Sequence, residues 1–484
     1  MPPVPFPRAN YFIATSRLLP GLDGGSTVAA MRRALDMAEY GGVRAQLLTF
    51  DLRIDYPAIR EEFIALGLAT ENTVLRNLCA ELRVEPELLR GSRDRPESAD
   101  TGLAAAPAEL SAAAESDAAG VVWRTEFHAP DGTIRYTEIH DEAGAPLLRL
   151  PYVSGRADWH RADVVIEVLD ADRTVSGRLA GFGELYRTWL DHVVATAAEA
   201  DTIVLAEARQ VGELLADDRH RRYRLVHSVH NAHTLAPHQW DSPMDELWTG
   251  WFDRVGDFDG VIWLTDAQRR DAERRFGAGR NWAVVPHPAP PPAPGVADRD
   301  PDRIVMVSRL AEQKRVDHAI RAWQRVVAAH PRARLDIYGD GPLSETLENL
   351  VAQLQLSDSV TLHGYRADAA AECDTAAALL LTSAFEGQGL VILEAFSRGC
   401  PVIAYDVNYG PAEMIAADAN GLLVPAGDIE ALAATLSGYL GDVDTIARLS
   451  AGAQLWAAEH GPVRAMQRLA SFLENVLEAE GVRE

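Results

Sequence analysis

The chain has 484 residues, which is enough for two or more domains that each bury a core. Its 46 Lys and Arg residues against 71 Asp and Glu residues give a formal net charge of -25. This charge argues against general nucleic-acid binding and against docking on an anionic membrane surface. With 47% hydrophobic and 24% charged residues, the composition is that of a globular protein rather than a disordered one.

Cysteine usage and the first residues indicate a cytoplasmic location. Cys79, Cys373 and Cys400 are widely spaced, so they form neither a disulfide framework nor a zinc-binding pattern, as expected in a reducing cytoplasm. The N-terminus, MPPVPFPRAN, lacks the charged and then apolar segments of a signal peptide. No run of about 18 apolar residues predicts a membrane span.

The first elements predict the start of a doubly wound parallel sheet. A strand is expected at 11–15, a helix at 26–40 and a second strand at 43–50, which is the order β-loop-α-β. The loop between the first strand and the helix contains Gly24 and Gly25 after Asp23. Missing side chains there would let the backbone approach a phosphate, although an ordinary turn between a strand and a helix explains the glycines equally well.

Residues 121–182 alternate between apolar and polar side chains, with turn signals at Asp131-Gly132 and at 141–144. We therefore predict an antiparallel β-meander inserted in the N-terminal domain. The Ala-, Ser- and Asp-rich stretch before it, 91–120, is interpreted as a mobile connection. Within the meander, Asp170-Ala171-Asp172 has the spacing of a metal-binding D-x-D motif. The chain returns at once as a strand, so a hairpin turn is the simpler interpretation.

A group of histidines follows the strand predicted at 224–229. Its members are His227, His230, His233 and His238. Their spacing does not match a helical zinc motif and no cysteine lies nearby, so a metal site is not predicted. Instead we expect one imidazole to leave the carboxyl edge of the sheet, where open α/β sheets place ligands. His230 fits this role best and His233 is the second choice, with a structural histidine as the alternative.

A Pro-rich linker, 286–303, separates two domains and should be stiff and extended. The next strand, RIVMVSRL, ends in Arg309, and the following helix begins near Lys314. Two fixed cations at a sheet edge can neutralise the charge on a leaving diphosphate, which is the task of a metal ion in other enzymes. The alternative is that both are ordinary surface residues.

Residues 377–405 read as strand, loop, helix and strand. Glu386 lies on the loop and Glu394 about one turn into the helix, so both can face the helix N-terminus. The backbone amides of Gln388, Gly389 and Leu390 open this helix, and such a terminus favours anions. A site in which backbone amides bind an anion and carboxylates accept hydrogen bonds from hydroxyls suits a sugar phosphate. Taken alone, the preference of acidic residues for a first helical turn explains the two glutamates equally well.

The segment EGQGLVILE, with the flanking SAF and EAFSRGCPVIA, resembles the E-x7-E signature of retaining GT-B glycosyltransferases of the family 4 type. The resemblance implies an α/β fold in which two Rossmann-like domains face each other across a cleft. In that family the first glutamate contacts the hydroxyls of the donor sugar and the second contacts the nucleotide ribose. We carry these roles to Glu386 and Glu394.

The same resemblance implies roles for the other candidate residues. Arg309 and Lys314 would bind the diphosphate, and His230 would lie beside the donor sugar. Gly24 and Gly25 resemble the donor-facing glycine loop of the family. The strand edge predicted at 362–365 resembles its base-contacting segment. This resemblance implies that His363, Gly364 and Tyr365 contact the base of the nucleotide. Tyr409 and Gly410 are expected to line the cleft, whereas Glu413 is interpreted as a helix-start residue.

The expected domain boundaries follow from these elements. Residues 1–295 form the N-terminal, acceptor-side domain with the meander at 121–182. Residues 296–460 form the nucleotide-sugar-binding domain, and a helix in 461–484 crosses back. The meander resembles that of poly(glycerol-phosphate) α-glucosyltransferases and of enzymes that glycosylate serine-rich adhesins. There it serves acceptor binding or assembly, so a homo-oligomer formed through the meander is one expectation.

The resemblance implies metal-independent transfer of a hexose or N-acetylhexosamine from a UDP-sugar to an acceptor hydroxyl, with retention and without a cofactor. The acceptor would be a polyol-phosphate polymer such as teichoic acid, or a protein serine. One alternative is a UDP-sugar epimerase, whose characteristic sequence is not visible. Another is a non-catalytic partner subunit that binds a nucleotide sugar. The presence of Arg309, Lys314, Glu386 and Glu394 together argues against such a degenerate subunit.

Overall fold

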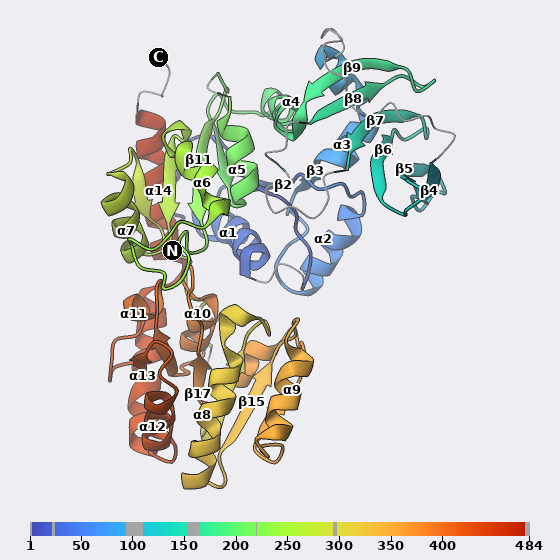
Figure 1. The fold of residues 1–484 in the computed structure, drawn as a ribbon. Coiled ribbons are helices and arrows are strands. Elements are labelled where there is room, and N and C mark those ends of the chain that lie inside the picture. Colours follow the sequence, from blue (N-terminus) through green and yellow to red (C-terminus); the bar gives the residue numbers. More distant parts are fainter. Residues whose placement is uncertain are drawn as a thin grey trace. The chain divides into compact units, whose positions relative to one another are not determined.

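The computed structural model describes residues 2–21, 25–92, 110–152, 160, 164–218, 220–293 and 298–479. The chain divides into two compact units, drawn in Figure 1. Unit 1 consists of Met1–Pro5, Val229–Asp245 and Ile262–Leu473. Unit 2 consists of Phe6–Ser228, Glu246–Val261 and Glu474–Glu484.

The parallel sheet that contains the N-terminal elements begins as the sequence predicts, with a strand, a helix and a second strand. These are β1 (Asn10–Thr15), α1 (Gly25–Gly41) and β2 (Ala45–Thr49). The described strands of this sheet have the order β13-β12-β11-β10-β1-β2-β3. The remaining strands are β3 (Leu75–Asn77), β10 (Thr202–Ala206), β11 (Arg224–Val229), β12 (Gly260–Trp263) and β13 (Trp282–Val284). The helices beside them are α2 (Tyr56–Ala65), α3 (Leu78–Val84), α5 (Arg209–Ala216) and α6 (Glu246–Asp253).

A second sheet of unit 2 is antiparallel, and its described strands follow one another in chain order. They are β4 (Ser111–Ser116), β5 (Val122–His128), β6 (Ile134–His140), β7 (Pro146–Pro151), β8 (Val165–Leu169) and β9 (Val175–Ala180), and α4 (Gly181–Ala195) follows. The interpretation of 91–120 as a mobile connection is wrong for β4, because this strand pairs with β5 from Ser111 opposite His128 to Ser116 opposite Val122.

The D-x-D sequence forms the turn between β8 and β9. The carboxylate of Asp172 accepts hydrogen bonds from the backbone N–H and the hydroxyl of Thr174, at 3.0 and 2.6 Å. Arg173, at φ 67°, donates its N–H to the carbonyl of Asp170. The hairpin interpretation of this sequence is therefore confirmed.

The described part of unit 1 contains a parallel sheet in the order β16-β15-β14-β17-β18-β19. Its strands are β14 (Asp300–Val307), β15 (Arg334–Tyr338), β16 (Val360–Leu362), β17 (Ala376–Leu381), β18 (Val402–Asp406) and β19 (Gly421–Pro425). The helices that accompany it are α8 (Val316–Ala329), α9 (Ser344–Gln353), α10 (Leu390–Ser397), α12 (Ile429–Tyr439) and α13 (Val443–Glu459). The last described helix of the chain is α14 (Pro462–Glu478). In Figure 1 the helices α8 and α9 lie beside β15.

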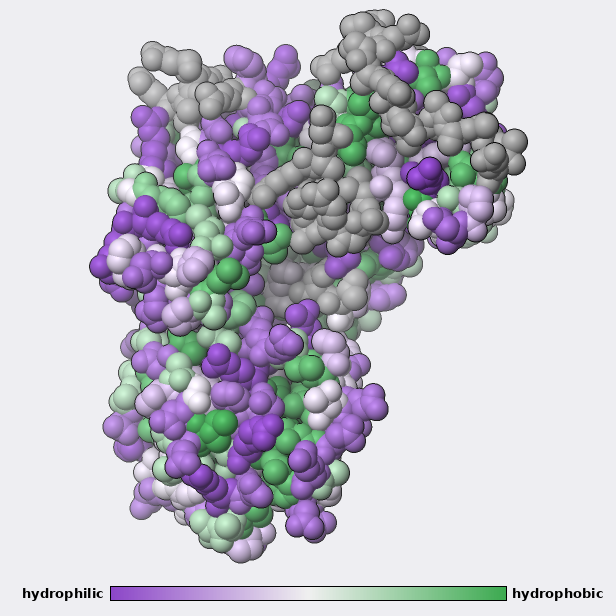
Figure 2. Space-filling view, in the orientation of Figure 1, coloured by the Kyte–Doolittle hydropathy of each residue, from purple (hydrophilic) through white to green (hydrophobic). Residues whose placement is uncertain are grey.

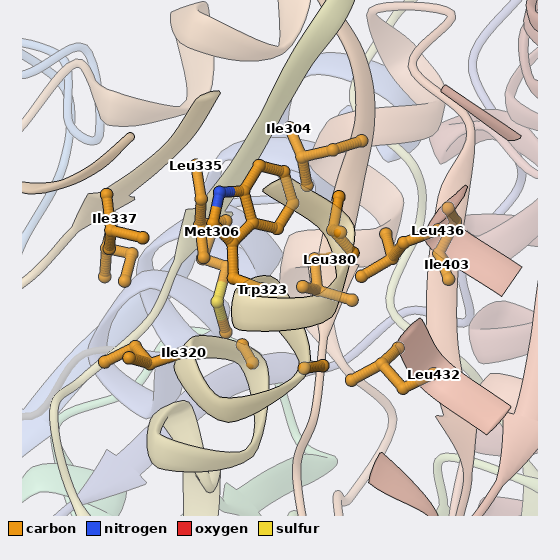
Figure 3. Packing of buried hydrophobic residues seen from close by; sticks show 14 of the residues in the cluster. Ile304, Met306, Ile320, Trp323, Leu335, Ile337, Leu380, Ile403, Leu432 and Leu436 are labelled. Carbon is orange, nitrogen blue, oxygen red and sulfur yellow. The ribbon is translucent and has the colours of Figure 1, made fainter. Parts of the chain in front are cut away.

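Two apolar layers hold this sheet, because successive residues of a strand point to opposite faces. Ile304 and Met306 face a layer completed by α8, α9 and α12, whereas Val305 faces a layer completed by α10 and α13. Trp323 of α8 is fully buried in the first layer, and Figure 3 shows it beside Met306 and Leu335. This packing fixes β14 and β17 as neighbours, so the loops that follow them leave the same edge of the sheet.

The surface of unit 1 is mixed. On the face shown in Figure 2, hydrophilic side chains predominate and hydrophobic residues form scattered patches between them. Among the described residues, no helix combines the length and the hydropathy that crossing a lipid bilayer requires.

Candidate active site

Two loops meet at the carboxyl edge of the unit 1 sheet. The loop after β14 carries Lys314, at the end of the short 3₁₀ helix Glu312–Lys314, and the loop after β17 carries Glu386. The Lys314 Nζ atom lies 2.6 Å from Oε1 of Glu386. The hydroxyl of Ser383 donates a hydrogen bond of 2.6 Å to the same oxygen. The structure thus brings together two residues that the sequence analysis assigned to the site.

Backbone contacts hold these two loops together. The N–H of Ala384 donates to the carbonyl of Gln313 at 2.7 Å, and the Gln313 side chain donates to the carbonyl of Phe385 at 2.9 Å. The hydroxyl of Thr382 lies 2.9 Å from the carbonyl oxygens of both Lys314 and Arg315. The cation and the carboxylate are therefore positioned by their backbones as well as by their own attraction.

Arg309 lies on the same side of the sheet, on the turn that follows β14. Its side chain is exposed, and its guanidinium forms no ion pair with any residue in the described part of the chain. The turn packs against Gly339, where a Cβ atom would lie 1.9 Å from the carbonyl oxygen of Ser308 and where φ is +140°. The N–H of Leu310 donates to the carbonyl of Asp340 at 2.9 Å. A fixed turn therefore presents a solvent-accessible cation.

The predicted amide group lies at the start of α10. Gly389 is the N-cap residue, with φ +93°, and Leu390 is the first residue of the helix. The Gln388 side chain is buried and has a separate set of contacts: its Oε1 accepts the N–H of His287 at 2.9 Å, and its Nε2 donates to the carbonyl of His287 at 3.2 Å. Glu394 lies one turn into α10 and is half-buried.

His230 follows β11 and approaches the Glu386 loop through its backbone. A Cβ atom on Gly387 would lie 1.8 Å from the carbonyl oxygen of His230, so only glycine fits beside this carbonyl. The Nδ1 atom of His230 lies 3.4 Å from Nε2 of His287. His233, the second choice, has no exposed surface, and its burial lowers its pKa to about 4. Of the two candidates, His230 is the one with a partly exposed side chain.

The residues assigned to the nucleotide base form a fixed edge after β16. The Nε2 atom of His363 lies 2.8 Å from Asp336 Oδ1, and its ring is nearly parallel to that of Tyr338, with centroids 4.4 Å apart. Burial would raise the pKa of Asp336, but hydrogen bonds from His363 and Arg303 hold it below its ordinary value. Gly364 has φ +72° and Tyr365 is 61% exposed.

This edge is connected to the turn that carries Arg309. The carbonyl of Gly364 accepts the N–H of Gly339 at 2.9 Å, and Gly339 packs against Ser308. The two proposed phosphate-binding cations and the proposed base-binding edge therefore belong to one connected set of loops within unit 1.

Other predicted residues have different places. Tyr409, expected to line the cleft, is buried and donates its hydroxyl to Asp271 of α7 (Asp266–Phe276) at 2.9 Å. Glu413 lies in the short helix α11 (Pro411–Met414), and its carboxylate accepts the N–H groups of Asp266 and Ala267 at 2.9 and 2.6 Å. It therefore caps the start of α7, which agrees with a structural role.

The glycine loop of the N-terminal domain is described only in part. Gly25 is the first residue of α1, in unit 2, and Gly24 lies outside the described residues.

Sequence reasoning did not identify His287. This residue lies in the segment interpreted as a linker, and its only local signal is a histidine flanked by two prolines. Its importance depends on contacts with Gln388 and His230, which are far from it in the sequence.

Residues 292–456 match the family described as glycosyl transferases group 1. This range contains Arg309, Lys314, Glu386 and Glu394 on the loops described above. Residues 292–456 are a glycosyltransferase group 1 domain. The recognition based on the E-x7-E segment is therefore confirmed.

Curated relatives match part of the chain. A poly(glycerol-phosphate) alpha-glucosyltransferase of Bacillus subtilis is 30% identical over 236 residues, covering 48% of this chain and 35% of the relative. An exopolysaccharide phosphotransferase of Streptomyces coelicolor is 38% identical over 192 residues, covering 39% of this chain and 20% of the relative. The chain thus matches about a third or less of the length of these proteins.

The similarity in fold to a solved structure extends beyond residues 292–456. The structure of TarM from Staphylococcus aureus, solved as a complex with fondaparinux, alpha-GlcNAc-glycerol and UDP, has a TM-score of 0.79 and 17% sequence identity. The similarity covers 98% of this chain and 100% of TarM. The chain therefore has the α/β GT-B fold that the resemblance implied.

Proposed function

We propose that the chain is a retaining glycosyltransferase that moves a hexose or an N-acetylhexosamine from a UDP-sugar to an acceptor hydroxyl without a metal ion. The observation that carries this proposal is the 2.6 Å pair of Lys314 and Glu386 at the carboxyl edge of the unit 1 sheet. It joins a cation suited to phosphate with a carboxylate suited to sugar hydroxyls. The exposed Arg309 lies on the same loop as Lys314 and supplies a second cation.

In the proposed complex, Arg309 and Lys314 bind the diphosphate of the donor. Negative charge accumulates on the diphosphate as the bond to the sugar breaks, and fixed cations stabilise that charge in place of a metal. Arg309 can bind phosphate oxygens in a bidentate manner, whereas Lys314 acts as a point charge shared between phosphate and Glu386. The amides of Gln388, Gly389 and Leu390 favour the same anion.

The carboxylates and the base-binding edge orient the rest of the donor. Glu386 accepts hydrogen bonds from hydroxyls of the sugar, and Glu394 accepts them from the ribose. His363, Gly364 and Tyr365 contact the base. His230 lies against the anomeric side of the sugar.

The acceptor hydroxyl attacks the anomeric carbon from the face that the diphosphate leaves, so the configuration is retained. Its proton passes to an oxygen of the departing diphosphate, and no protein nucleophile takes part. The matched relatives support a phosphate-polymer acceptor: one is named as a poly(glycerol-phosphate) glucosyltransferase, and TarM was solved with UDP and alpha-GlcNAc-glycerol. A serine-containing protein is the second acceptor class.

The test combines UDP-glucose or UDP-N-acetylglucosamine with poly(glycerol phosphate), poly(ribitol phosphate) or a serine-rich peptide. Transfer is followed by release of UDP, and the anomeric configuration of the product is read by NMR. We expect an α-linked product that forms equally well in EDTA. Glu386→Gln should lower kcat by about 10²–10³-fold, the size of effect seen when a group that orients or stabilises reacting atoms is removed.

The control is Glu348→Gln, which changes an exposed glutamate on α9 and should leave transfer unchanged. Full activity of Glu386→Gln, a β-linked product, or a requirement for a divalent ion would each contradict the proposal.

A further inference from the structure

The segment 285–289, VPHPA, lies in unit 1 with one side buried. Val285, His287 and Ala289 are buried, with 3%, 9% and 0% of their surface exposed, whereas the intervening prolines are partly exposed. Each N–H of this segment is bonded: Val285 donates to the carbonyl of Trp263, His287 to the Gln388 side chain and Ala289 to the carbonyl of His460. Prolines have no N–H, so the backbone of the segment has no unsatisfied donor.

His287 is the most firmly held residue of this segment. The Gln388 amide binds both its N–H, at 2.9 Å, and its carbonyl, at 3.2 Å. Pro288 also restricts the backbone of the residue before it to extended conformations. The backbone of His287 is therefore fixed by Gln388, a neighbour of Glu386 in the sequence.

The imidazole of His287 contacts that of His230. The Nε2 of His287 and the Nδ1 of His230 are 3.4 Å apart. The two rings are nearly parallel, with planes that differ by 14° and centroids 5.3 Å apart. A hydrogen bond between two imidazole nitrogens needs one donor and one acceptor, so the contact holds a single proton.

We propose that His287 is a positioning residue that fixes the ring orientation and the tautomer of His230 and is itself held by Gln388. This inference rests on the proposed function, in which His230 lies against the donor sugar. The contact with His287 engages Nδ1 of His230, so it constrains which of the two ring nitrogens of His230 carries the proton. A partner that fixes one nitrogen of a histidine sets the chemistry of the other, as the carboxylate does in catalytic triads.

The first test compares three variants at His287. His287→Phe keeps a planar ring but removes the nitrogen, and it should lower kcat about tenfold, the loss expected for one hydrogen bond. The affinity for UDP, measured by calorimetry, should not change, because other residues bind the diphosphate. His287→Asn and His287→Gln, which retain a side-chain hydrogen-bonding group, should recover part of the loss in at least one case.

The second test asks whether Gln388 acts through His287. Gln388→Leu should lower kcat to a similar extent, and the double variant Gln388→Leu/His287→Phe should be no worse than either single variant. His330→Phe is the matched control. His330 lies at the end of α8, and its Nε2 contacts the carbonyl of Ser437 in α12, so its loss should leave kcat unchanged. Fully additive losses, or a His287→Phe enzyme with normal kcat, would overturn the proposal.

The third test does not need turnover, so it separates this inference from the proposed function. In protein labelled with ¹⁵N-histidine, the ring signals of His230 are assigned by their loss in His230→Gln. We expect one tautomer of His230 in the unaltered protein and a mixture of tautomers in His287→Phe. Identical His230 signals in the two proteins would reject the positioning role of His287. If the tautomer changes but the unaltered protein transfers no sugar, the proposed function is rejected and the positioning role stands.

Discussion

The ammonium of Lys314 lies 2.6 Å from a carboxylate oxygen of Glu386, across a sequence separation of 72 residues. Only 21% and 9% of the two side chains are exposed, so each charge has lost most of its water and depends on the other. Removing one partner of such a pair costs more than removing both, because the remaining charge is buried without compensation.

We therefore expect non-additive effects on stability at this pair. Lys314→Met and Glu386→Gln should each lower the free energy of unfolding by about 1–3 kcal/mol, the cost of leaving a buried charged group without its partner. The double variant should lose less than the sum, with a coupling energy of at least about 0.5 kcal/mol. Chemical denaturation of the four proteins measures this cycle.

The matched control is the pair of Arg325 and Glu430, whose side chains are 58% and 74% exposed. The same cycle there should give a coupling energy near zero, since exposed ion pairs contribute about 0–1 kcal/mol. Equal coupling at the two pairs would show that burial of Lys314 and Glu386 has no energetic effect.

Gly387 should not tolerate a side chain. A methyl group there would lie 1.8 Å from the carbonyl oxygen of His230, so Gly387→Ala has to move either His230 or the Glu386 loop. We expect a loss of about 1–3 kcal/mol in unfolding free energy, as for other overpacked sites, together with reduced transfer.

Gly438 of α12 provides the comparison, since a Cβ atom there meets nothing within 4 Å. Gly438→Ala should stabilise the protein by about 0.5–1 kcal/mol, because alanine loses less backbone entropy in a helix. Thermal unfolding of both variants measures the difference, and equal melting temperatures would contradict the steric argument.

Glu413 should contribute to stability by capping α7. Its carboxylate accepts the N–H groups of Asp266 and Ala267, and Thr265 accepts the N–H of Gln268. Glu413→Ala should lower the unfolding free energy by about 0.5–2 kcal/mol, the usual cost of losing a helix cap. Glu413→Gln keeps one acceptor oxygen and should lose less. Two equally destabilised variants would indicate that the charge, rather than the hydrogen bonds, matters at this position.

Asp36 should make stability depend on pH. Burial raises its pKa from 3.8 to about 7, with smaller opposing effects from Arg32 and Arg33 and a further increase from Glu39. Between pH 4 and 7 the unfolded chain has lost this proton while the folded chain keeps it, so the contribution of Asp36 to stability decreases as the pH rises through this range.

Asp36→Asn should remove this dependence and be more stable than the unaltered protein at pH 8. Melting temperatures at pH 5 and pH 8 provide the test. If the melting temperatures of the unaltered protein and of Asp36→Asn change equally between pH 5 and pH 8, the pH dependence comes from other groups.

Lys314 and Glu386 could be placed together from the sequence because both follow buried strands of a parallel sheet, and loops at the carboxyl ends of neighbouring strands meet at one edge. The start of α10 was predicted from local helix-start signals, whereas the base-contacting role of the edge at His363 came from the resemblance to the glycosyltransferase family.

His287, the Gln388 side chain and the cap at Glu413 could not be predicted in this way. Each acts through a contact between segments distant in the sequence, and no periodic pattern encodes such a contact. Strand β4 was missed for a related reason: SAAAES is exposed along its whole length, so it shows no alternation of burial, and its pairing with β5 defines it.

Because Pro286 and Pro288 have no N–H, the segment 285–289 can donate backbone hydrogen bonds on one side only. Because the N–H groups of successive residues in an extended chain point to opposite sides, those of Val285, His287 and Ala289 share one side. On that side they bond to Trp263, Gln388 and His460. The opposite side offers carbonyl oxygens and no donor. An incoming strand cannot complete a ladder there, so this segment is protected against edge-to-edge aggregation.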